Sequence, residues 1–337
     1  TCGADSRRIK DVGNPWLDAG IVPFSTLHYR TDRDYWEKWF PADWVSESFP
    51  GQFRNWFYSM LAMGTVLRRE RPFKSLFGYA TLYGEDGRPM HKSWGNAIEF
   101  NEAAERMGVD VMRWMYATAR PEDNILFGYH TADEARRELL VLWNVLAFFT
   151  TYARLGQWQP TRAVVGEQEQ DATRSLLDRW IVSRAAEMAA VAGSCMDLYD
   201  TRGATRAISE FVDDLSQWWL RRSRRRLSRG DDAVDRAAAF GTLHLALMSV
   251  ARTMAPLLPF LAEEFHQVLV APTDEEAPES VHLTAWPAAD LAALRDESLE
   301  ATMADLRRAV ELGRNLRSQA GLKVRQPLAR LWLAMPA

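Results

Sequence analysis

Cysteine is scarce in this chain, and a long apolar run is missing. Its two cysteines, Cys2 and Cys195, are too few for a disulfide framework, so the sequence favours a reducing compartment and a cytoplasmic location. No run of about 18 apolar residues occurs, which argues against a membrane-spanning helix. A net charge of -4 argues against nonspecific nucleic-acid binding by the whole chain, although it allows a local basic surface.

The composition is otherwise that of an ordinary globular protein. Apolar residues make up 47% of the 337 residues and charged residues 26%, which predicts about two domains with a substantial core. Tryptophan is the exception, with 14 residues, and many of them lie beside Arg, Asp or Asn. We therefore expect some tryptophans to line binding surfaces while others fill the core.

The chain opens at Thr1 without an initiator methionine or a signal peptide. We interpret it as a fragment, or as a truncated relative of a longer protein. Cys2-Gly3 is similar to the end of a zinc-knuckle turn whose partner cysteines would lie upstream. One cysteine supports no metal site, so this chain gives no basis for zinc, although the full-length protein could hold it.

The two halves of the chain differ in their patterns. Residues 1–130 mix short apolar runs with turns and predict an α/β fold, part of a parallel doubly wound sheet. The expected elements are strands at 21–24, 44–45 and 76–79, and helices at 53–67 and 101–107.

The second half reads as almost entirely helical. We expect a connecting helix and linker over 131–170, with a polar connector at 156–171, and a helical bundle over 171–337. Pro256 and Pro259 should bend a helix or begin a new one. Near the end, a helix should stop at Gly321 and a basic extended strand should follow.

The Glu85–Asn96 loop carries the most informative short motif. Turn signals at Asp86-Gly87 and Gly95-Asn96 bracket Arg88, His91, Lys92 and Ser93. A loop of this kind can hold a polyphosphate, with Lys92 as a point charge and Ser93 and backbone N–H groups as directed donors. A solvated turn is the alternative, and the motif alone favours that alternative.

An arginine run is the second informative motif. Trp218-Trp219 is followed by six arginines, among them Arg221, Arg222, Arg224, Arg225 and Arg226. This density exceeds what a helix C-terminus needs, because like charges one turn apart repel. RNA contact, with stacking by Trp218 and Trp219, is one interpretation. Pairing of these arginines with acids of the bundle is the other.

Together these segments resemble class I aminoacyl-tRNA synthetases, and specifically the isoleucine–tRNA ligase family. The resemblance runs in order along almost the whole chain. The matching segments are Asp11-Val12 with 16–20 (DVxDVWFDSG in the family), 40–43 (FPAD), 56–58 (GWFY), 85–96 (DEDGRKMSKSKGN), 110–114 (DALRW), 142–145 with 151–153, 177–181, 219–226 (WYVRRSRRR), 255–264 (APFTPFLAEE), 280–283 with 286–287, and 321–328 (GIKVRQPL).

The resemblance implies the C-terminal part of a Rossmann-like catalytic domain, with its KMSKS-like loop at 89–93, followed by a helical anticodon-binding domain. It implies ATP-dependent attachment of L-isoleucine to tRNA(Ile) through isoleucyl-adenylate, with Mg²⁺, and we expect a monomer. The residues it assigns are Lys92, His91 and Arg88 for catalysis; Lys92, Ser93, Met90 and Tyr79 for ATP; Glu47, Gln52, Trp16 and Trp56 for the adenylate and the aliphatic pocket; and Trp218, Arg221, Arg222, Arg224, Arg225 and Arg226 for tRNA. It implies no metal ligand within this chain.

The chain also departs from the family pattern. Pro89 and His91 stand where the family has the first lysine and the first serine of KMSKS, and Tyr79-Ala80 replaces a His-Gly pair. No H-x-G-H motif occurs, so we expect the chain alone to be inactive. Arg88 and His91 are the expected substitutes for the missing lysine. The alternatives are a tRNA-binding paralogue with lost or altered chemistry, and a valine–tRNA ligase.

Overall fold

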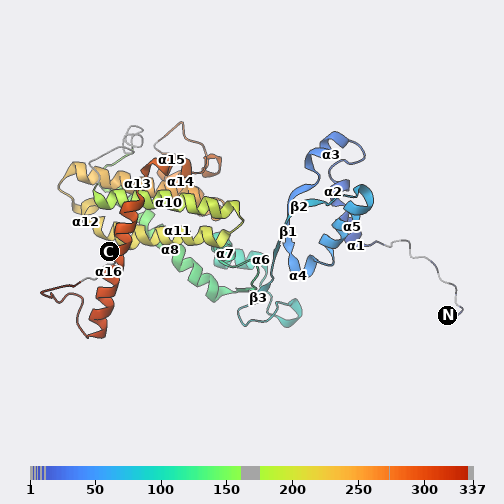
Figure 1. Cartoon of the computed structure of the whole chain (residues 1–337), viewed down its shortest axis with the longest axis horizontal. Coiled ribbons are helices and arrows are strands. Elements are labelled where there is room, and N and C mark those ends of the chain that lie inside the picture. Colours follow the sequence, from blue (N-terminus) through green and yellow to red (C-terminus); the bar gives the residue numbers. More distant parts are fainter. Residues whose placement is uncertain are drawn as a thin grey trace. The chain divides into compact units, whose positions relative to one another are not determined.

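The computed structural model (Figure 1) describes residues 3, 5, 7, 10, 13–160, 175–272 and 274–332. The chain forms two compact units. Unit 1 comprises Thr1–Glu99 and Ala119–Thr131, and unit 2 comprises Phe100–Thr118 and Ala132–Ala337. Cys2, Asp11-Val12 and most of the expected connector at 156–171 lie outside the described residues.

Unit 1 is built from short helices and two pairs of parallel strands. One pair is β1–β2 and the other is β3–β4. Its elements are α1 (Pro15–Gly20), α2 (Val22–Ser25), α3 (Arg33–Trp39), β1 (Ala42–Ser48), α4 (Phe49–Gln52), α5 (Trp56–Arg68), β2 (Phe73–Tyr79), β3 (Leu82–Gly84), the 3₁₀ turn η1 (Lys92–Trp94) and β4 (Ile125–Phe127).

The β1–α5–β2 segment places the candidate site residues. Phe57 and Met60 of α5 are buried against Val45 of β1, so the helix covers the sheet that its own flanking strands form. Because the two strands run parallel, their carboxyl ends meet at the same edge, with Ser48 opposite Tyr79. The predicted strands at 44–45 and 76–79 and the helix at 53–67 are therefore confirmed.

The prediction of a strand at 21–24 is wrong, because this segment forms α2. Short apolar runs fit a strand or a buried helix equally well. Pro23 lies in the first turn of α2, a position where its missing N–H costs nothing. Phe24 then packs against Trp36 of α3 and Phe40, so tertiary packing selects the helix.

Unit 2 is helical and contains one large continuous core. Its most buried large side chains include Trp180, Phe211, Trp219, Phe240 and Phe265. Its elements are α6 (Phe100–Met107), α7 (Val109–Thr118), α8 (Tyr129–Leu155, whose first turn belongs to unit 1), α10 (Leu176–Asp197), α11 (Thr201–Asp213), the π-helix η2 (Asp214–Leu220), α12 (Arg221–Arg229), α13 (Ala233–Met254), α14 (Pro259–Leu269), the short turns η3 (Val281–Leu283), α15 (Ala288–Leu291) and η4 (Ala292–Leu294), and α16 (Glu297–Gln319).

Helix ends in unit 2 follow the local sequence. A capping box of Ser175 and Asp178 begins α10, and Pro259 is the first residue of α14, which confirms that it starts a new helix. Gly321 follows the end of α16 with a φ of 66°. The expected strand after Gly321 is wrong. The chain turns there instead, because Arg317 Nη1 donates to the carbonyls of Lys323 and Gln326 at 3.0 and 2.7 Å.

Candidate active site and nucleic-acid interface

The carboxyl ends of β1 and β2 bring Glu47 and Tyr79 together. The Tyr79 hydroxyl donates to Glu47 Oε1 at 3.2 Å, and the same oxygen accepts the Ser48 N–H at 2.8 Å. Partial burial and the nearby Glu47 charge raise the pKa of Tyr79 above its usual value, so the hydroxyl keeps its proton. Glu47 Oε2 has no hydrogen-bond partner among the described residues. A carboxylate is thus held with one oxygen available, at the sheet edge where α/β proteins bind ligands.

Ser48 provides a second polar atom at this edge that lacks a hydrogen-bond partner among the described residues. Its Oγ is buried and has no hydrogen-bond partner within the described part of the chain. A buried hydroxyl without a partner costs free energy, and a bound polar group would remove that cost.

The predicted pocket residues lie on elements that pack together in unit 1. Trp56 Nε1 donates to the Ala19 carbonyl of α1 at 3.0 Å, and Gln52 Oε1 accepts the Trp56 N–H at 3.3 Å. Trp16, also on α1, has 40% of its surface exposed. The structure therefore brings Trp56 and Gln52 into contact and leaves Trp16 on the adjoining helix with an open face.

The first turn of the Glu85–Asn96 loop is fixed by hydrogen bonds. The Gly84 N–H donates to the Arg88 carbonyl at 2.9 Å. Gly87 takes a φ of 73°, which glycine adopts without strain. Asp86 Oδ1 accepts the Arg88 N–H at 3.0 Å. The turn predicted at Asp86-Gly87 is confirmed.

Asn96 closes the far end of the loop. Its side-chain oxygen accepts the His91 N–H at 2.9 Å, and its side-chain nitrogen donates to the Pro89 carbonyl at 3.0 Å. Gly95 takes a φ of 70°, so the second turn is also confirmed. The asparagine thus holds the segment that carries His91 in a fixed shape.

The charged side chains of the loop face solvent. Arg88 Nε donates to Asp86 Oδ2 at 2.8 Å, and the arginine side chain remains 73% exposed. The His91 ring lies 4.4 Å from the Trp94 ring, edge to face. Lys92 is exposed and has no ion pair among the described residues. Its ammonium is free to meet an anion, whereas Arg88 is already partly neutralised.

This donor set fits a triphosphate. Lys92 and His91 supply cationic and N–H donors, exposed Ser93 supplies a hydroxyl, and half-buried Met90 lies between the two turns. Among the described residues, no group of three His, Cys, Asp or Glu side chains is arranged to hold a metal ion. Mg²⁺ at such sites is held largely by the substrate phosphates, so a preformed cage is not required. No hydrogen bond or ion pair in the described chain joins the loop to Glu47.

The arginine run of unit 2 divides into two groups. Arg221, Arg222, Arg224 and Arg225 are exposed on α12, and Arg224 lies over the Phe148 ring at 5.2 Å. These four side chains are available to a polyanion.

Arg226 belongs to the second group, because it is paired inside the bundle. Its guanidinium contacts both oxygens of Asp178, which is 0% exposed, at 2.9 and 2.8 Å, and both oxygens of Asp235 at 2.8 and 2.6 Å. These two acids raise the pKa of Arg226 despite the cost of its burial. Arg226 therefore fits the interpretation in which arginines of the run pair with acids of the bundle. The sequence analysis placed it among the tRNA-contacting residues.

Trp219 is likewise an interior residue, so the expectation that it stacks on RNA is wrong. Its ring is 0% exposed, and its Nε1 donates to Asp178 Oδ1 at 2.8 Å. Trp218 remains half-buried on the solvent side of η2. Adjacent residues of a helix point to different sides, so the two neighbouring tryptophans meet different environments.

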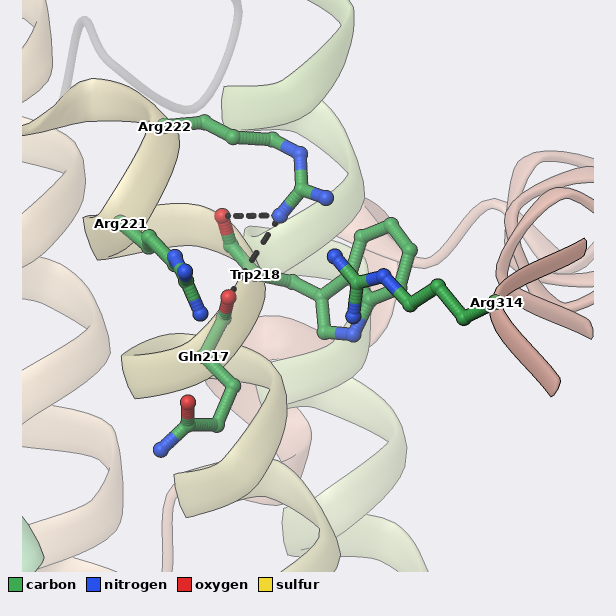
Figure 2. Close-up of a pocket in the computed structure, with 5 residues that line it drawn as sticks. All are labelled: Gln217, Trp218, Arg221, Arg222 and Arg314. Atoms are coloured by element: carbon green, nitrogen blue, oxygen red, sulfur yellow. Dashed lines mark hydrogen bonds between the residues drawn. The ribbon is translucent and has the colours of Figure 1, made fainter. Parts of the chain in front are cut away.

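Sequence reasoning missed Arg314 of α16, which converges on Trp218 together with Arg221 and Arg222 (Figure 2). A signal was present in the spacing. Arg307 and Arg314 are seven residues apart and share a helix face with buried Met303. The sequence predicts a helical bundle over 171–337, but it does not show that these arginines approach Trp218.

Two family models match the chain. The model of class I tRNA synthetases (I, L, M and V) matches residues 3–127, and the model of the anticodon-binding domain of tRNA ligases matches residues 178–331. The chain belongs to the class I tRNA synthetases. The first match contains the strand-end residues and the lysine loop, and the second contains the arginine run and α16.

Relatives with high similarity are named isoleucine–tRNA ligase. That of Streptomyces avermitilis is 39% identical over 99% of this chain and 31% of the relative. That of Thermus thermophilus is 38% identical over 99% of this chain and 32% of the relative. The chain thus spans about a third of the length of the curated relatives that it matches.

Solved structures agree on the fold. A leucyl-tRNA synthetase from Agrobacterium radiobacter, in complex with tRNA and LeuAMS, aligns with a TM-score of 0.62 at 16% identity, over 88% of this chain and 35% of that chain. A Mycobacterium tuberculosis methionyl-tRNA synthetase with methionyl-adenylate aligns with a TM-score of 0.61 at 16% identity, over 80% and 55%. The fold is therefore a Rossmann-like part followed by a helical anticodon-binding part. Within the described residues, no helix is long and apolar enough to cross a membrane.

Proposed function

We propose that the complete protein containing this chain attaches L-isoleucine to tRNA(Ile) in an ATP-dependent reaction. The observation that carries the proposal is the similarity, at 34–39% identity along nearly the whole chain, to proteins named isoleucine–tRNA ligase. We also expect a monomer in the cytoplasm, and we interpret the chain as a part that is inactive alone.

The strand-end carboxylate has a defined task in this proposal. Glu47, oriented by Tyr79, offers its second oxygen to the substrate ammonium or to a ribose hydroxyl. Trp16 and Trp56 line the aliphatic pocket, which favours a branched apolar side chain over a polar one. Valine differs by one methylene, which such a pocket discriminates by only about 1–3 kcal/mol.

The loop acts on the other end of ATP. The isoleucine carboxylate attacks the α-phosphate, giving isoleucyl-adenylate and pyrophosphate, and a ribose hydroxyl at the tRNA 3′ end then takes the aminoacyl group. Mg²⁺, bound with ATP, would neutralise part of the phosphate charge. Lys92 places its ammonium on the leaving pyrophosphate, where charge develops in the transition state. His91 and Ser93 add donors from the same turn, and Asn96 keeps that turn closed.

A tRNA-binding paralogue with lost or altered chemistry is the alternative. Exposed arginines in a chain whose lysine loop is altered support it, because Pro89 removes one cation and Arg88 is partly neutralised by Asp86. A valine–tRNA ligase is the alternative within the same class.

Aminoacylation of tRNA(Ile) transcript by the complete protein tests the proposal, with isoleucine and valine compared at equal concentration. We expect charging with isoleucine and a lower kcat/KM for valine. Binding of the transcript without charging by any amino acid would refute the proposal and support the paralogue. A preference for valine and tRNA(Val) would assign the chain to the other ligase.

A further inference from the structure

A small cavity beside Trp218 is lined by guanidinium groups. It encloses about 310 Å³ between η2, α12 and α16. Trp218, Arg221 and Arg222 line it from η2 and α12, and Arg314 reaches toward the tryptophan from α16 (Figure 2). The remaining lining residue is Gln217, so among the described residues no acidic side chain faces the cavity.

A buried ion pair fixes α16 beside this cavity. Arg307 pairs with Asp214 of η2, which is 1% exposed and also accepts a hydrogen bond from Arg184 Nε at 2.8 Å. The Arg307 guanidinium lies 5.3 Å from the Trp218 ring centroid. Arg314 is two turns further along the same helix face. The Arg307–Asp214 ion pair therefore keeps the face that carries Arg314 turned toward the cavity.

Trp218 serves as a platform for a cation. The Arg222 guanidinium lies over its ring at 3.9 Å from the centroid, and Arg222 Nη1 donates to the Trp218 carbonyl at 3.1 Å. A guanidinium on an aromatic face is stabilised by the ring quadrupole. This face of the ring is therefore occupied by Arg222.

The cavity concentrates positive charge that no described residue neutralises. Burial, together with repulsion from Arg314, Arg221 and Arg307, lowers the pKa of Arg222. Arg221, Arg222 and Arg314 have no ion pair among the described residues, whereas Arg307 is paired with Asp214. Converging like charges raise the free energy of the site, and a bound anion would offset that repulsion.

We propose that this cavity binds a phosphate group of the tRNA backbone. Arg221, Arg222 and Arg314 would hold the phosphate, and the Trp218 ring would hold the Arg222 guanidinium in place. The inference rests on the proposed tRNA-binding function, and it adds Arg314 and the chemistry of the ligand. Guanidinium groups pair with phosphate oxygens in a bidentate fork. An arginine can also read the acceptors of a guanine edge, but three converging guanidinium groups fit a phosphate better, because its negative charge offsets their repulsion. The site therefore positions the RNA and carries no sequence preference of its own.

The test is the salt dependence of tRNA binding by the complete protein. The Kd of fluorescently labelled tRNA(Ile) transcript would be measured by anisotropy between about 50 and 200 mM salt. We expect Arg314→Gln to weaken binding about ten-fold at the lower salt, and to reduce the slope of log Kd against log salt by about one. Arg308→Gln is the matched control, because it removes the same charge from another face of α16, where the arginine is exposed. It should leave the slope close to that of the unmodified protein.

A second transcript, with substituted anticodon nucleotides, separates phosphate binding from base reading. The proposal requires the same fold-loss from Arg314→Gln on both transcripts. A loss confined to one transcript, or a loss without a change in slope, would overturn the phosphate assignment, and an unchanged Kd would overturn the site itself. These outcomes are independent of aminoacylation. A salt-dependent loss in a protein that charges no tRNA would keep the site and reject the proposed function.

Discussion

Replacing Arg226 with glutamine should destabilise unit 2 rather than weaken RNA binding. Arg226 contacts both oxygens of Asp178, which is fully buried, and links it to Asp235 at the start of α13. Arg226→Gln would leave the Asp178 charge in the core without its cation. Arg225, the preceding residue, is exposed and has no ion pair within the described chain, so Arg225→Gln is the matched control.

The magnitude follows from the burial of each partner. Removing one member of a buried ion pair costs about 3–5 kcal/mol. Asp178 keeps three donors, Trp219 Nε1 at 2.8 Å, the Ser175 hydroxyl at 2.7 Å and the Ser175 N–H at 3.3 Å, which favours the lower end, about 3 kcal/mol. Asp235 remains 44% exposed, so losing its ion pair with Arg226 adds at most about 1 kcal/mol to the destabilisation. For a unit of this size, a total loss of about 3–4 kcal/mol should lower the melting temperature by about 6–16 °C.

Calorimetry of the complete protein and urea unfolding followed by tryptophan fluorescence would measure the loss. Adding Asp178→Asn to the Arg226→Gln variant should recover part of it, because the uncompensated charge is then gone. The reasoning fails if Arg226→Gln unfolds like Arg225→Gln. An equal loss of tRNA affinity from both variants, without destabilisation, would show that Arg226 is an RNA ligand after all.

Two further predictions concern the strand-end pair and the buried histidine. Tyr79→Phe should raise the KM for isoleucine about 2- to 10-fold, because Glu47 loses a hydrogen bond worth about 0.5–1.5 kcal/mol; a KM equal to that of the exposed control Tyr58→Phe would contradict the positioning role. Burial lowers the pKa of His244, whose Nε2 contacts the Leu269 carbonyl at 3.0 Å. Its folded-state pKa is depressed, so its contribution is present above its unfolded value near 6.5 and is lost as pH falls below that value. The loss should grow as the pH is lowered further, toward the folded-state pKa. Thermal unfolding at these pH values should show this loss, and His244→Gln should show a smaller one; equal losses would assign the acid sensitivity to other groups.

Local chemistry allowed much of unit 1 to be predicted from the sequence. Glycines at 87 and 95 mark turns that need a positive φ, and the structure places both there. The β1 and β2 strands follow from short apolar runs next to turn residues. The run at 21–24 has the same character, yet it forms a helix because Phe24 packs on Trp36. Contacts of this kind are set by tertiary packing and leave no periodic pattern in so short a segment.

The division of the arginine run could not be predicted for a related reason. Arg225 and Arg226 are equivalent in local sequence, but only the second meets Asp178, 48 positions away. A pairing over that separation depends on how α10 and α12 pack together. The spacing of Arg307 and Arg314 places them on one helix face, but the part of Arg314 in the Trp218 cavity also requires α16 to lie against η2, which the sequence does not show. The family resemblance predicts the order of the segments along the chain. The structure shows which arginine side chains are paired within the bundle and which are exposed.

Isoleucine-dependent ATP–pyrophosphate exchange by the complete protein tests the central claim most directly. The account predicts exchange with isoleucine, and a fall of about 100-fold or more when Lys92 becomes alanine, because a charge-stabilising group in the transition state is lost. Lys38→Ala, at an exposed lysine of α3, should exchange normally. Exchange that survives Lys92→Ala unchanged, or no exchange with any amino acid, would contradict the account.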